Sequence, residues 1–238
     1  MLKCFRGTKK MSAMATDNFV LNKATAAEFL VNGSGGAILL KDISWEEYEL
    51  FLEDFAEKSG WRLAYDTGNL EIMPPTFEHE FSSFSLGYFV SAYCEEFELE
   101  FVGAGSTTFR RAILKKGVEP DECFYIQSAD KVIGKTKLLD PKNYPMPDVA
   151  VEIDITHGSL DKFSIYAMLG IPEIWLYDGE NLTFFELEDL KYLPISKSIA
   201  LPLLSAEKLT EFVNLTKTKG QLQALKSFRQ YLNELKMP

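Results

Sequence analysis

The sequence predicts an α/β domain built around a mixed sheet. Two observations support this prediction. Segments with a helical spacing of apolar residues alternate along the chain with short strand-like runs. One of these runs, residues 149–153, is nearly all apolar, which is typical of a central strand buried on both faces. A length of 238 residues, 46% of them hydrophobic, is enough for one domain with a substantial core.

The first half of the predicted domain follows a glycine-rich loop that ends at Gly36. The predicted elements are a strand at residues 37–42, a helix at 45–58, a hairpin with strands at 61–65 and 70–73, and a second helix at 78–98. The first helix has a start signal, because Ser44 is followed by Glu47 in the pattern of a capping box. The second helix carries an aromatic stripe that we expect to pack in the core, namely Phe81, Phe84, Phe89, Tyr93 and Phe97.

The second half is predicted to supply the central sheet and the C-terminal helices. The predicted elements are strands at 99–109, 122–126 and 148–153, a helix at 159–169, strands at 174–177 and 182–187, and helices at 205–212 and 219–235. We therefore divide the chain into an N-terminal tail and loop (1–36), a main domain (37–212) and a C-terminal helix (213–238). The apolar side of that last helix either caps the core or pairs with another subunit.

The composition excludes several classes of protein. A net charge of -10, from 35 acidic and 25 basic residues, excludes a generally basic, histone-like nucleic-acid binder but not a local basic groove. The three cysteines are too few and dispersed for a disulfide scaffold, and two histidines exclude a histidine-rich zinc site. No apolar run reaches the about 18 residues of a membrane-spanning helix. We therefore expect a cytoplasmic protein without a membrane partner.

What remains is a group of acids at the ends of the predicted central strands. Asp121 and Asp148 each follow a proline at the start of a strand, and Glu152 lies late in the second strand. If these strands pair antiparallel, Asp121 lies beside Glu152, whereas Asp148 lies about 13 Å from Glu152 along its own strand. One metal ion cannot bind both ends of that strand, so Asp121 and Glu152 are the predicted ligands. Oxygen ligands of this kind suit Mg²⁺ or Mn²⁺.

Lys162 adds a positive charge to this group. It lies in the first turns of the helix predicted to follow the strand of Glu152. There it can orient a metal-activated water or stabilise charge that develops on a phosphate. A structural interpretation stays open, because a buried glutamate often pairs with a lysine and a Pro-Asp dipeptide often only opens a turn.

Several segments, taken in order, resemble a known family. They are Leu70-Glu-Ile-Met-Pro-Pro75 with His79, Glu119-Pro-Asp-Glu-Cys-Phe-Tyr-Ile126, Pro147-Asp-Val-Ala-Val-Glu-Ile-Asp154, and Lys162-Phe-Ser-Ile-Tyr166 running into Leu169-Gly-Ile-Pro-Glu-Ile-Trp175. The set spans about residues 44–212 and resembles the Uma-type restriction endonucleases, a cyanobacteria-rich family within the PD-(D/E)XK nuclease superfamily.

The resemblance implies a restriction-endonuclease-like αβββαβ core with a mixed central sheet, an N-terminal helix and hairpin, and C-terminal helices. It implies Mg²⁺-dependent hydrolysis of phosphodiester bonds, with Asp121 and Glu152 as the acidic motif residues. The sequence departs from the superfamily pattern at Asp154, which stands where a lysine is usual. The family similarly lacks that lysine, which is thought to have moved to the following helix, and this points to Lys162.

The resemblance also draws attention to Glu71 and His79. They fall where the family has a strand glutamate and a helix-start histidine, and either can reach a metal or a phosphate. Ordinary hydrogen bonding explains them too. Asp154 shares a strand face with Glu152, about 6.6 Å further on. It can bind a second metal or pair with Lys162, and both remain open.

A DNA surface needs positive charge. Arg110, Arg111, Lys115 and Lys116 cluster just before Asp121, in a predicted β-hairpin loop. They can contact a phosphate backbone, although solvated loop tips are an equally good interpretation.

The favoured function is a metal-dependent DNA endonuclease acting through metal-activated water. The alternative is a catalytically inactive nucleic-acid-binding or regulatory module on the same fold. A third candidate is a hydrolase of another phosphate ester such as RNA, which a pocket too narrow for a duplex would favour. We also expect a homodimer, because cutting both strands needs two sites and twofold dimers are common.

Overall fold

The structure is a computed structural model that describes residues 37–55, 61–135, 145–155 and 160–236. The contacts divide the chain into two units, Met1–Gly36 and Ala37–Pro238. The predicted tail and loop at 1–36 and the end of the first predicted helix lie outside the described residues. No described helix is long and apolar enough to cross a membrane.

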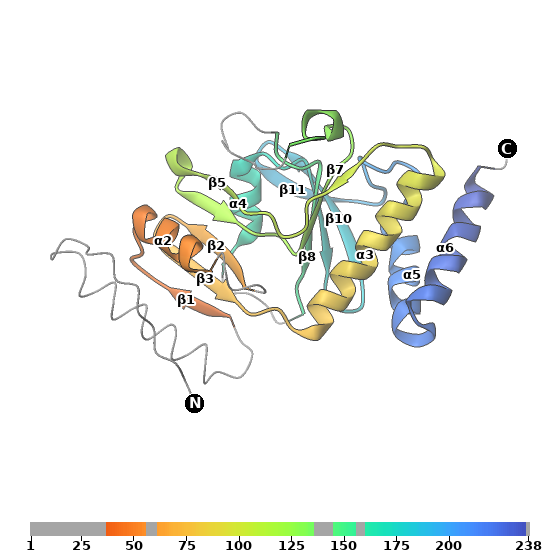
Figure 1. Cartoon of the computed structure of the whole chain (residues 1–238), viewed down its shortest axis with the longest axis horizontal. Coiled ribbons are helices and arrows are strands. Elements are labelled where there is room, and N and C mark those ends of the chain that lie inside the picture. Colours follow the sequence, from red (N-terminus) through yellow and green to blue (C-terminus); the bar gives the residue numbers. More distant parts are fainter. Residues whose placement is uncertain (1–36, 56–60, 136–144, 156–159, 237–238) are drawn as a thin grey trace. The chain divides into compact units, whose positions relative to one another are not determined.

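A six-stranded sheet forms the centre of the second unit (Figure 1). Its strands, in spatial order, are β11 (Lys191–Ile195), β10 (Leu182–Glu188), β9 (Glu173–Tyr177), β8 (Val149–Ile153), β7 (Glu122–Tyr125) and β4 (Val102–Gly103). The β8–β9 pair is parallel and the other pairs are antiparallel. The prediction of an α/β fold with a mixed central sheet is therefore confirmed.

The predicted hairpin belongs to a second, antiparallel sheet of five strands. Its strands, in spatial order, are β1 (Ile38–Leu40), β3 (Asn69–Met73), β2 (Arg62–Asp66), β6 (Lys116–Val118) and β5 (Phe109–Arg111). Helix α2 (Trp45–Phe55) packs on this sheet through Tyr48, whose ring stacks on Tyr65 with 4.7 Å between centroids. Strand β6, which pairs with β2, needs a glycine at position 117, because a Cβ there would collide with the Tyr48 hydroxyl.

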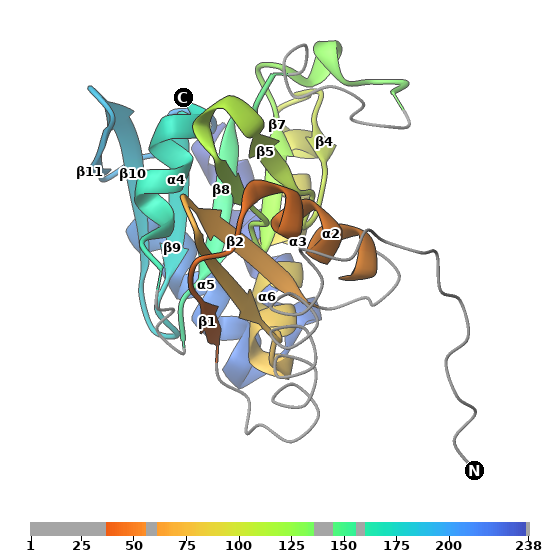
Figure 2. The same ribbon diagram turned by 90° about the vertical axis from the view of Figure 1, so that its left-hand side faces the viewer.

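The two faces of β8 belong to two different core clusters, as alternation along a strand requires. Val149, Val151 and Ile153 pack with helices α3 (Phe77–Glu96), α5 (Ala206–Lys219) and α6 (Gln221–Leu235). Ala150 packs on the opposite face with α4 (Lys162–Leu169) and part of the five-stranded sheet. Figure 2 shows α4 on the side of the central sheet away from α5 and α6. Glu152, two residues after Ala150, therefore faces α4.

Several predicted boundaries were wrong. The predicted strand at 99–109 contains only β4 and the first residue of β5, and β11 was missed because Pro194 appeared to exclude a strand. Proline is tolerated there because β11 is an edge strand. The last two helices run from 206 to 219 and from 221 to 235. The apolar side of α6, with Phe228 and Leu232, is buried against the rest of the core, so this helix caps the core.

The prediction that the aromatic stripe of α3 packs in the core was partly wrong. Phe89 and Tyr93 are buried, whereas Phe84 is 55% exposed. The helix has a mixed pattern because its buried side also uses small and polar residues, including His79 and Ser82. Part of the aromatic surface of α3 consequently faces outwards.

Candidate active site

Strands β7 and β8 bring the two predicted metal ligands together. They pair antiparallel with Glu122 opposite Val151, which confirms the assumed pairing and places Asp121 next to Glu152. The backbone N–H of Asp121 donates to the Val151 carbonyl at 3.0 Å. Its carboxylate oxygen Oδ2 accepts a hydrogen bond from the Ile153 N–H at 2.8 Å. Asp121 is thus fixed in both its backbone and its side chain at the end of β8.

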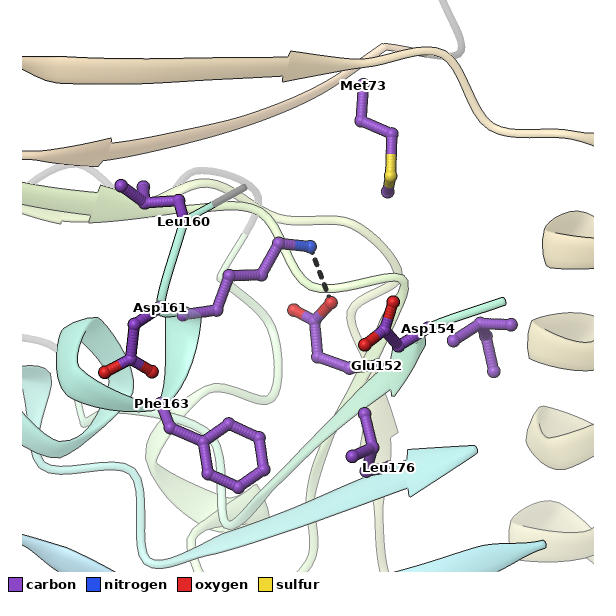
Figure 3. A pocket seen from close by; sticks show the side chains of 9 residues that line it. Met73, Glu152, Asp154, Leu160, Asp161, Phe163 and Leu176 are labelled. Carbon is purple, nitrogen blue, oxygen red and sulfur yellow. Dashed lines mark hydrogen bonds and ion pairs between the residues drawn. The ribbon is translucent and has the colours of Figure 1, made fainter. Parts of the chain in front are cut away.

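Lys162 reaches the same point from α4. It is the first residue of that helix, whose N-cap is Asp161, with its side chain accepting from the Ser164 N–H. The Lys162 Nζ donates to Glu152 Oε2 at 2.7 Å, the pair drawn as a dashed line in Figure 3. One turn later, the Tyr166 hydroxyl donates to the other Glu152 oxygen in a short hydrogen bond. Two successive turns of α4 therefore hold both oxygens of Glu152.

Burial dominates the electrostatics of this group. Asp121 and Glu152 are each 4% exposed. Loss of solvation raises the pKa of both carboxyls, and the nearby Lys162 opposes this change. Burial acts to lower the pKa of Lys162, but the Glu152 and Asp121 charges more than offset it, so the Lys162 pKa is raised and its ammonium stays charged.

Arg62 completes the site, and the sequence analysis missed it. This residue begins β2 and is 8% exposed. Its Nε lies 3.6 Å from Asp121 Oδ1, and its Nη2 donates to Glu80 Oε1 of α3 at 3.1 Å. The signal was a charge inside a predicted strand, because a buried charge requires a partner. The guanidinium links the five-stranded sheet to α3 and to Asp121, the residue before β7.

Glu71 and His79 also lie at this end of the molecule. Glu71 is 1% exposed on β3, and its Oε2 accepts from the Leu160 N–H at 3.0 Å. Leu160 lies two residues before Lys162, so Glu71 positions the start of α4. Glu71 is also among the acids that raise the Lys162 pKa. The predicted strand glutamate is therefore close to the predicted lysine.

His79 combines a capping role with a buried donor. The Thr76 N–H donates to its Nδ1 at 3.4 Å, and the Thr76 hydroxyl lies 2.7 Å from the same atom. Because Nδ1 accepts, the proton of the neutral ring is assigned to Nε2. That Nε2 is buried without a hydrogen-bond partner in the described part of the chain. Burial and then the positive charge of Lys162 lower the His79 pKa, so the ring is neutral near pH 7.

The two remaining acidic candidates, Asp148 and Asp154, lie in different places relative to Glu152. The Asp148 carboxylate accepts from the Ile126 and Ser128 N–H groups and the Ser128 hydroxyl, at the start of β8 and away from Glu152. Asp154 lies beside Glu152 in Figure 3 and lines the same cavity. The geometry thus places Asp154 near the candidate site and leaves Asp148 in a loop.

A small cavity opens at the Glu152–Lys162 pair. Its volume is about 170 Å³. Its walls are apolar and acidic, with Met73, Leu160, Phe163 and Leu176 on the apolar part and Asp154 and Asp161 beside them. Figure 3 shows Met73 extending toward this space from the end of its strand. A substrate group that reaches the charged pair must therefore fit among these side chains.

The four basic residues proposed for DNA contact lie on the β5–β6 hairpin, as predicted. Lys116 pairs closely with Asp66, and Arg110 lies 4.0 Å from Glu49. Arg111 is half-buried, and Lys115 is exposed with a left-handed backbone. Two of the four charges are therefore already compensated by acids.

The donor set can be tested against a divalent metal. The described residues contain no group of three or more His, Cys, Asp or Glu side chains arranged to hold a metal ion. Magnesium, however, is usually bound through one or two carboxylates, with water and substrate phosphates as its other ligands. Asp121 and Glu152 meet that smaller requirement.

A comparison with protein families decides the relationship. The family model described as "Uma2: Putative restriction endonuclease" matches residues 45–215. The chain belongs to the Uma2 family. The matched residues include the six-stranded sheet, the five-stranded sheet except β1, and the residues that line the cavity, and the membership supports a nuclease.

Two further comparisons add less. A crystal structure described as that of a putative nuclease belonging to DUF820, from Anabaena variabilis, is similar to this Uma2 protein with a TM-score of 0.47 and 12% identity. The similarity covers 68% of this chain and 98% of that one. The search of curated proteins gave no significant match.

Proposed function

We propose that this Uma2 protein is a metal-dependent DNA endonuclease that hydrolyses phosphodiester bonds with metal-activated water. The observation that carries the proposal is the β7–β8 pairing, which puts Asp121 beside Glu152 while Lys162 lies 2.7 Å from that glutamate. Family membership supports a nuclease independently of this geometry.

In this proposal, Asp121 and Glu152 hold one Mg²⁺ or Mn²⁺ ion. When bound there, the ion would lower the pKa of a water molecule and neutralise a phosphate oxygen. Arg62 lies against Asp121 Oδ1 and keeps that carboxylate oriented. Glu71 fixes the Leu160 backbone and so positions the turn from which Lys162 extends.

Two side chains act on the substrate itself. The Lys162 ammonium can move from Glu152 to a phosphate oxygen, where negative charge develops during hydrolysis. The buried His79 Nε2–H is a second donor on this side of the site, suited to a phosphate or leaving oxygen. On the β5–β6 hairpin, Lys115 and Arg111 are the better placed of the four basic residues to contact DNA, because Arg110 and Lys116 pair with acids.

The decisive experiment compares wild type with Lys162→Ala on supercoiled plasmid and on circular single-stranded DNA, at low salt with Mg²⁺ or Mn²⁺. We expect metal-dependent cleavage by wild type and a loss of at least about a hundredfold in the variant, as for removal of one transition-state donor. Lys208→Ala is the matched control, because that lysine lies on α5, half-buried, and pairs with Glu211 three residues on. Cleavage that persists in Lys162→Ala, or that survives EDTA, would contradict the proposal.

One observation favours the alternative of a non-catalytic nucleic-acid-binding module. Both Glu152 oxygens have protein partners, and Asp121 is held by the Ile153 N–H and Arg62. A site satisfied in this way can be a structural ion-pair network. Calorimetric titration with Mn²⁺ distinguishes the nuclease from the binding module. The nuclease should bind an ion, and Glu152→Gln should abolish that binding. The module should show no such binding.

A further inference from the structure

The ionisable groups of the candidate site are recessed. Asp121, Glu152 and His79 are exposed by 4%, 4% and 1%, and the Lys162 side chain by 15%. The adjoining cavity has a volume of about 170 Å³. A duplex holds each phosphate beside rigid neighbours on a helix whose major groove alone is about 12 Å wide. A phosphate on a flexible single strand therefore enters this recess more readily than one held in a duplex.

The described surface is also poorly suited to gripping a duplex. Duplex affinity arises mainly from lysine and arginine side chains that neutralise phosphates. Many of the described basic side chains already pair with acids, namely Arg62, Arg110, Lys116, Lys162, Lys208, Lys217, Arg229 and Lys236. These pairs reduce the positive charge available to phosphates, so other contacts can contribute to substrate affinity.

An aromatic ridge on α3 offers such contacts. The ridge consists of Phe77, Phe81, Phe84 and Tyr88, which recur on one side of the helix. Phe77, Phe84 and Tyr88 are 84%, 55% and 44% exposed. The rings form two pairs, with centroids 5.9 Å apart for Phe77–Phe81 and 4.5 Å apart for Phe84–Tyr88. From Phe77 to Tyr88 the helix rises by about 16 Å.

The ridge begins at the end of α3 that follows the cavity-lining strand β3. Phe77 is the first residue of α3 and follows Met73, which lines the cavity, by four residues. The two acids beside the ridge are compensated, because Glu78 pairs with Lys217 and Glu80 pairs with Arg62. Exposed rings stack on unpaired bases whatever their sequence, whereas paired bases present no free face to them.

We propose that the substrate is an unpaired DNA strand, whose bases stack on the aromatic ridge while one phosphate enters the cavity at Glu152 and Lys162. This inference rests on the proposed nuclease function and specifies its substrate. It assigns to Phe77, Phe84 and Tyr88 the role of a base-stacking surface. An intact duplex is a poor substrate because it satisfies neither contact.

The first test uses labelled DNA of one sequence as a single strand, a blunt duplex and a duplex with an unpaired overhang. With Mn²⁺, we expect the single strand and the overhang to be cut at least about tenfold faster than the blunt duplex. Equal or faster cutting of the blunt duplex overturns the proposal and leaves the nuclease function intact.

The second test measures binding in EDTA, where no hydrolysis occurs, by fluorescence anisotropy. Phe84→Ala should weaken single-strand binding by about tenfold, in line with the loss of one base–ring stack. Phe84→Tyr keeps the ring and should bind as wild type does. Leu190→Ala is the matched control, because Leu190 is 63% exposed and lies in the turn between β10 and β11.

The binding result is independent of catalysis, so the two proposals fail separately. Loss of single-strand binding in Phe84→Ala supports the stacking surface even if no DNA is cut. Unchanged binding by Phe84→Ala overturns it. Unchanged binding together with a change from dimer to monomer in light scattering overturns it as well and assigns the ridge to a second copy of the chain.

Discussion

The two ends of β8 hold their acids in opposite ways. At the start, the Asp148 carboxylate accepts from the Ile126 N–H at 2.6 Å and from the N–H and hydroxyl of Ser128, both at 2.9 Å. At the other end, among the described residues, Glu152 accepts hydrogen bonds from the side chains of Lys162 and Tyr166. One strand of five residues thus connects a carboxylate fixed by a loop with one fixed by a helix.

This difference separates an acid that shapes the fold from one that is suited to chemistry. Backbone N–H groups cannot leave Asp148 without unfolding the loop that carries them. A lysine side chain can change its position by rotamer changes alone, so the oxygens of Glu152 can exchange partners while the fold persists. Asp121 is intermediate, because one oxygen faces the Ile153 N–H and the other faces Arg62.

The largest expected effect comes from Glu152→Gln. We expect cleavage to fall by about a thousandfold, because a predicted metal ligand is lost. The fold should tolerate the change, since Glu71 and Asp121 then balance Lys162 and Arg62. Initial rates of DNA cleavage and urea unfolding measure the two effects. If Glu152→Gln unfolds easily and Asp148→Ala does not, the contrast between the two ends of β8 is wrong.

Asp148→Ala should have the next largest effect, and on stability instead of chemistry. It leaves two backbone N–H groups and a hydroxyl without their acceptor, at a cost of about 2–3 kcal/mol in the free energy of unfolding. Urea denaturation at neutral pH checks this value. At urea concentrations below the unfolding transition, each folded Asp148→Ala molecule should cleave DNA at the wild-type rate. A loss of cleavage without a loss of stability would place Asp148 in the site instead.

The sequence was sufficient to predict the Glu152 end of β8 because simple geometry decides it. Antiparallel pairing and a known rise per residue place Asp121 beside Glu152 whatever the loops do, and the register of β7 and β8 agrees. The apolar run at 149–153 likewise predicted a strand buried on both faces, which is confirmed. Local patterns therefore predicted the centre of the fold well.

What the sequence could not supply were contacts between distant segments. Arg62 meets Asp121 only because the hairpin of β2 and β3 joins a second sheet beside the first, and no local spacing encodes that arrangement. The exposure of Phe84 was missed for the same reason. A helical aromatic stripe predicts burial only when the covering elements are known, and α5 and α6 cover a different side of α3.

The smallest expected effect concerns the pH dependence of stability and tests whether His79 shares the buried environment of Glu152. Burial and Lys162 hold the folded-state pKa of His79 below its ordinary value of 6.5. As the pH falls through 6.5, the unfolded chain therefore binds a proton at His79 that the folded protein does not bind. The free energy of unfolding decreases until the folded-state pKa is reached. Burial raises the pKa of Asp121 and Glu152, so these two groups make the protein more stable as the pH falls, and they do so equally in wild type and in His79→Asn.

His79→Asn should consequently lose less stability than wild type between neutral and mildly acidic pH, in urea titrations at each pH. Identical losses would mean that His79 is solvated like an ordinary surface histidine and would remove it from the site.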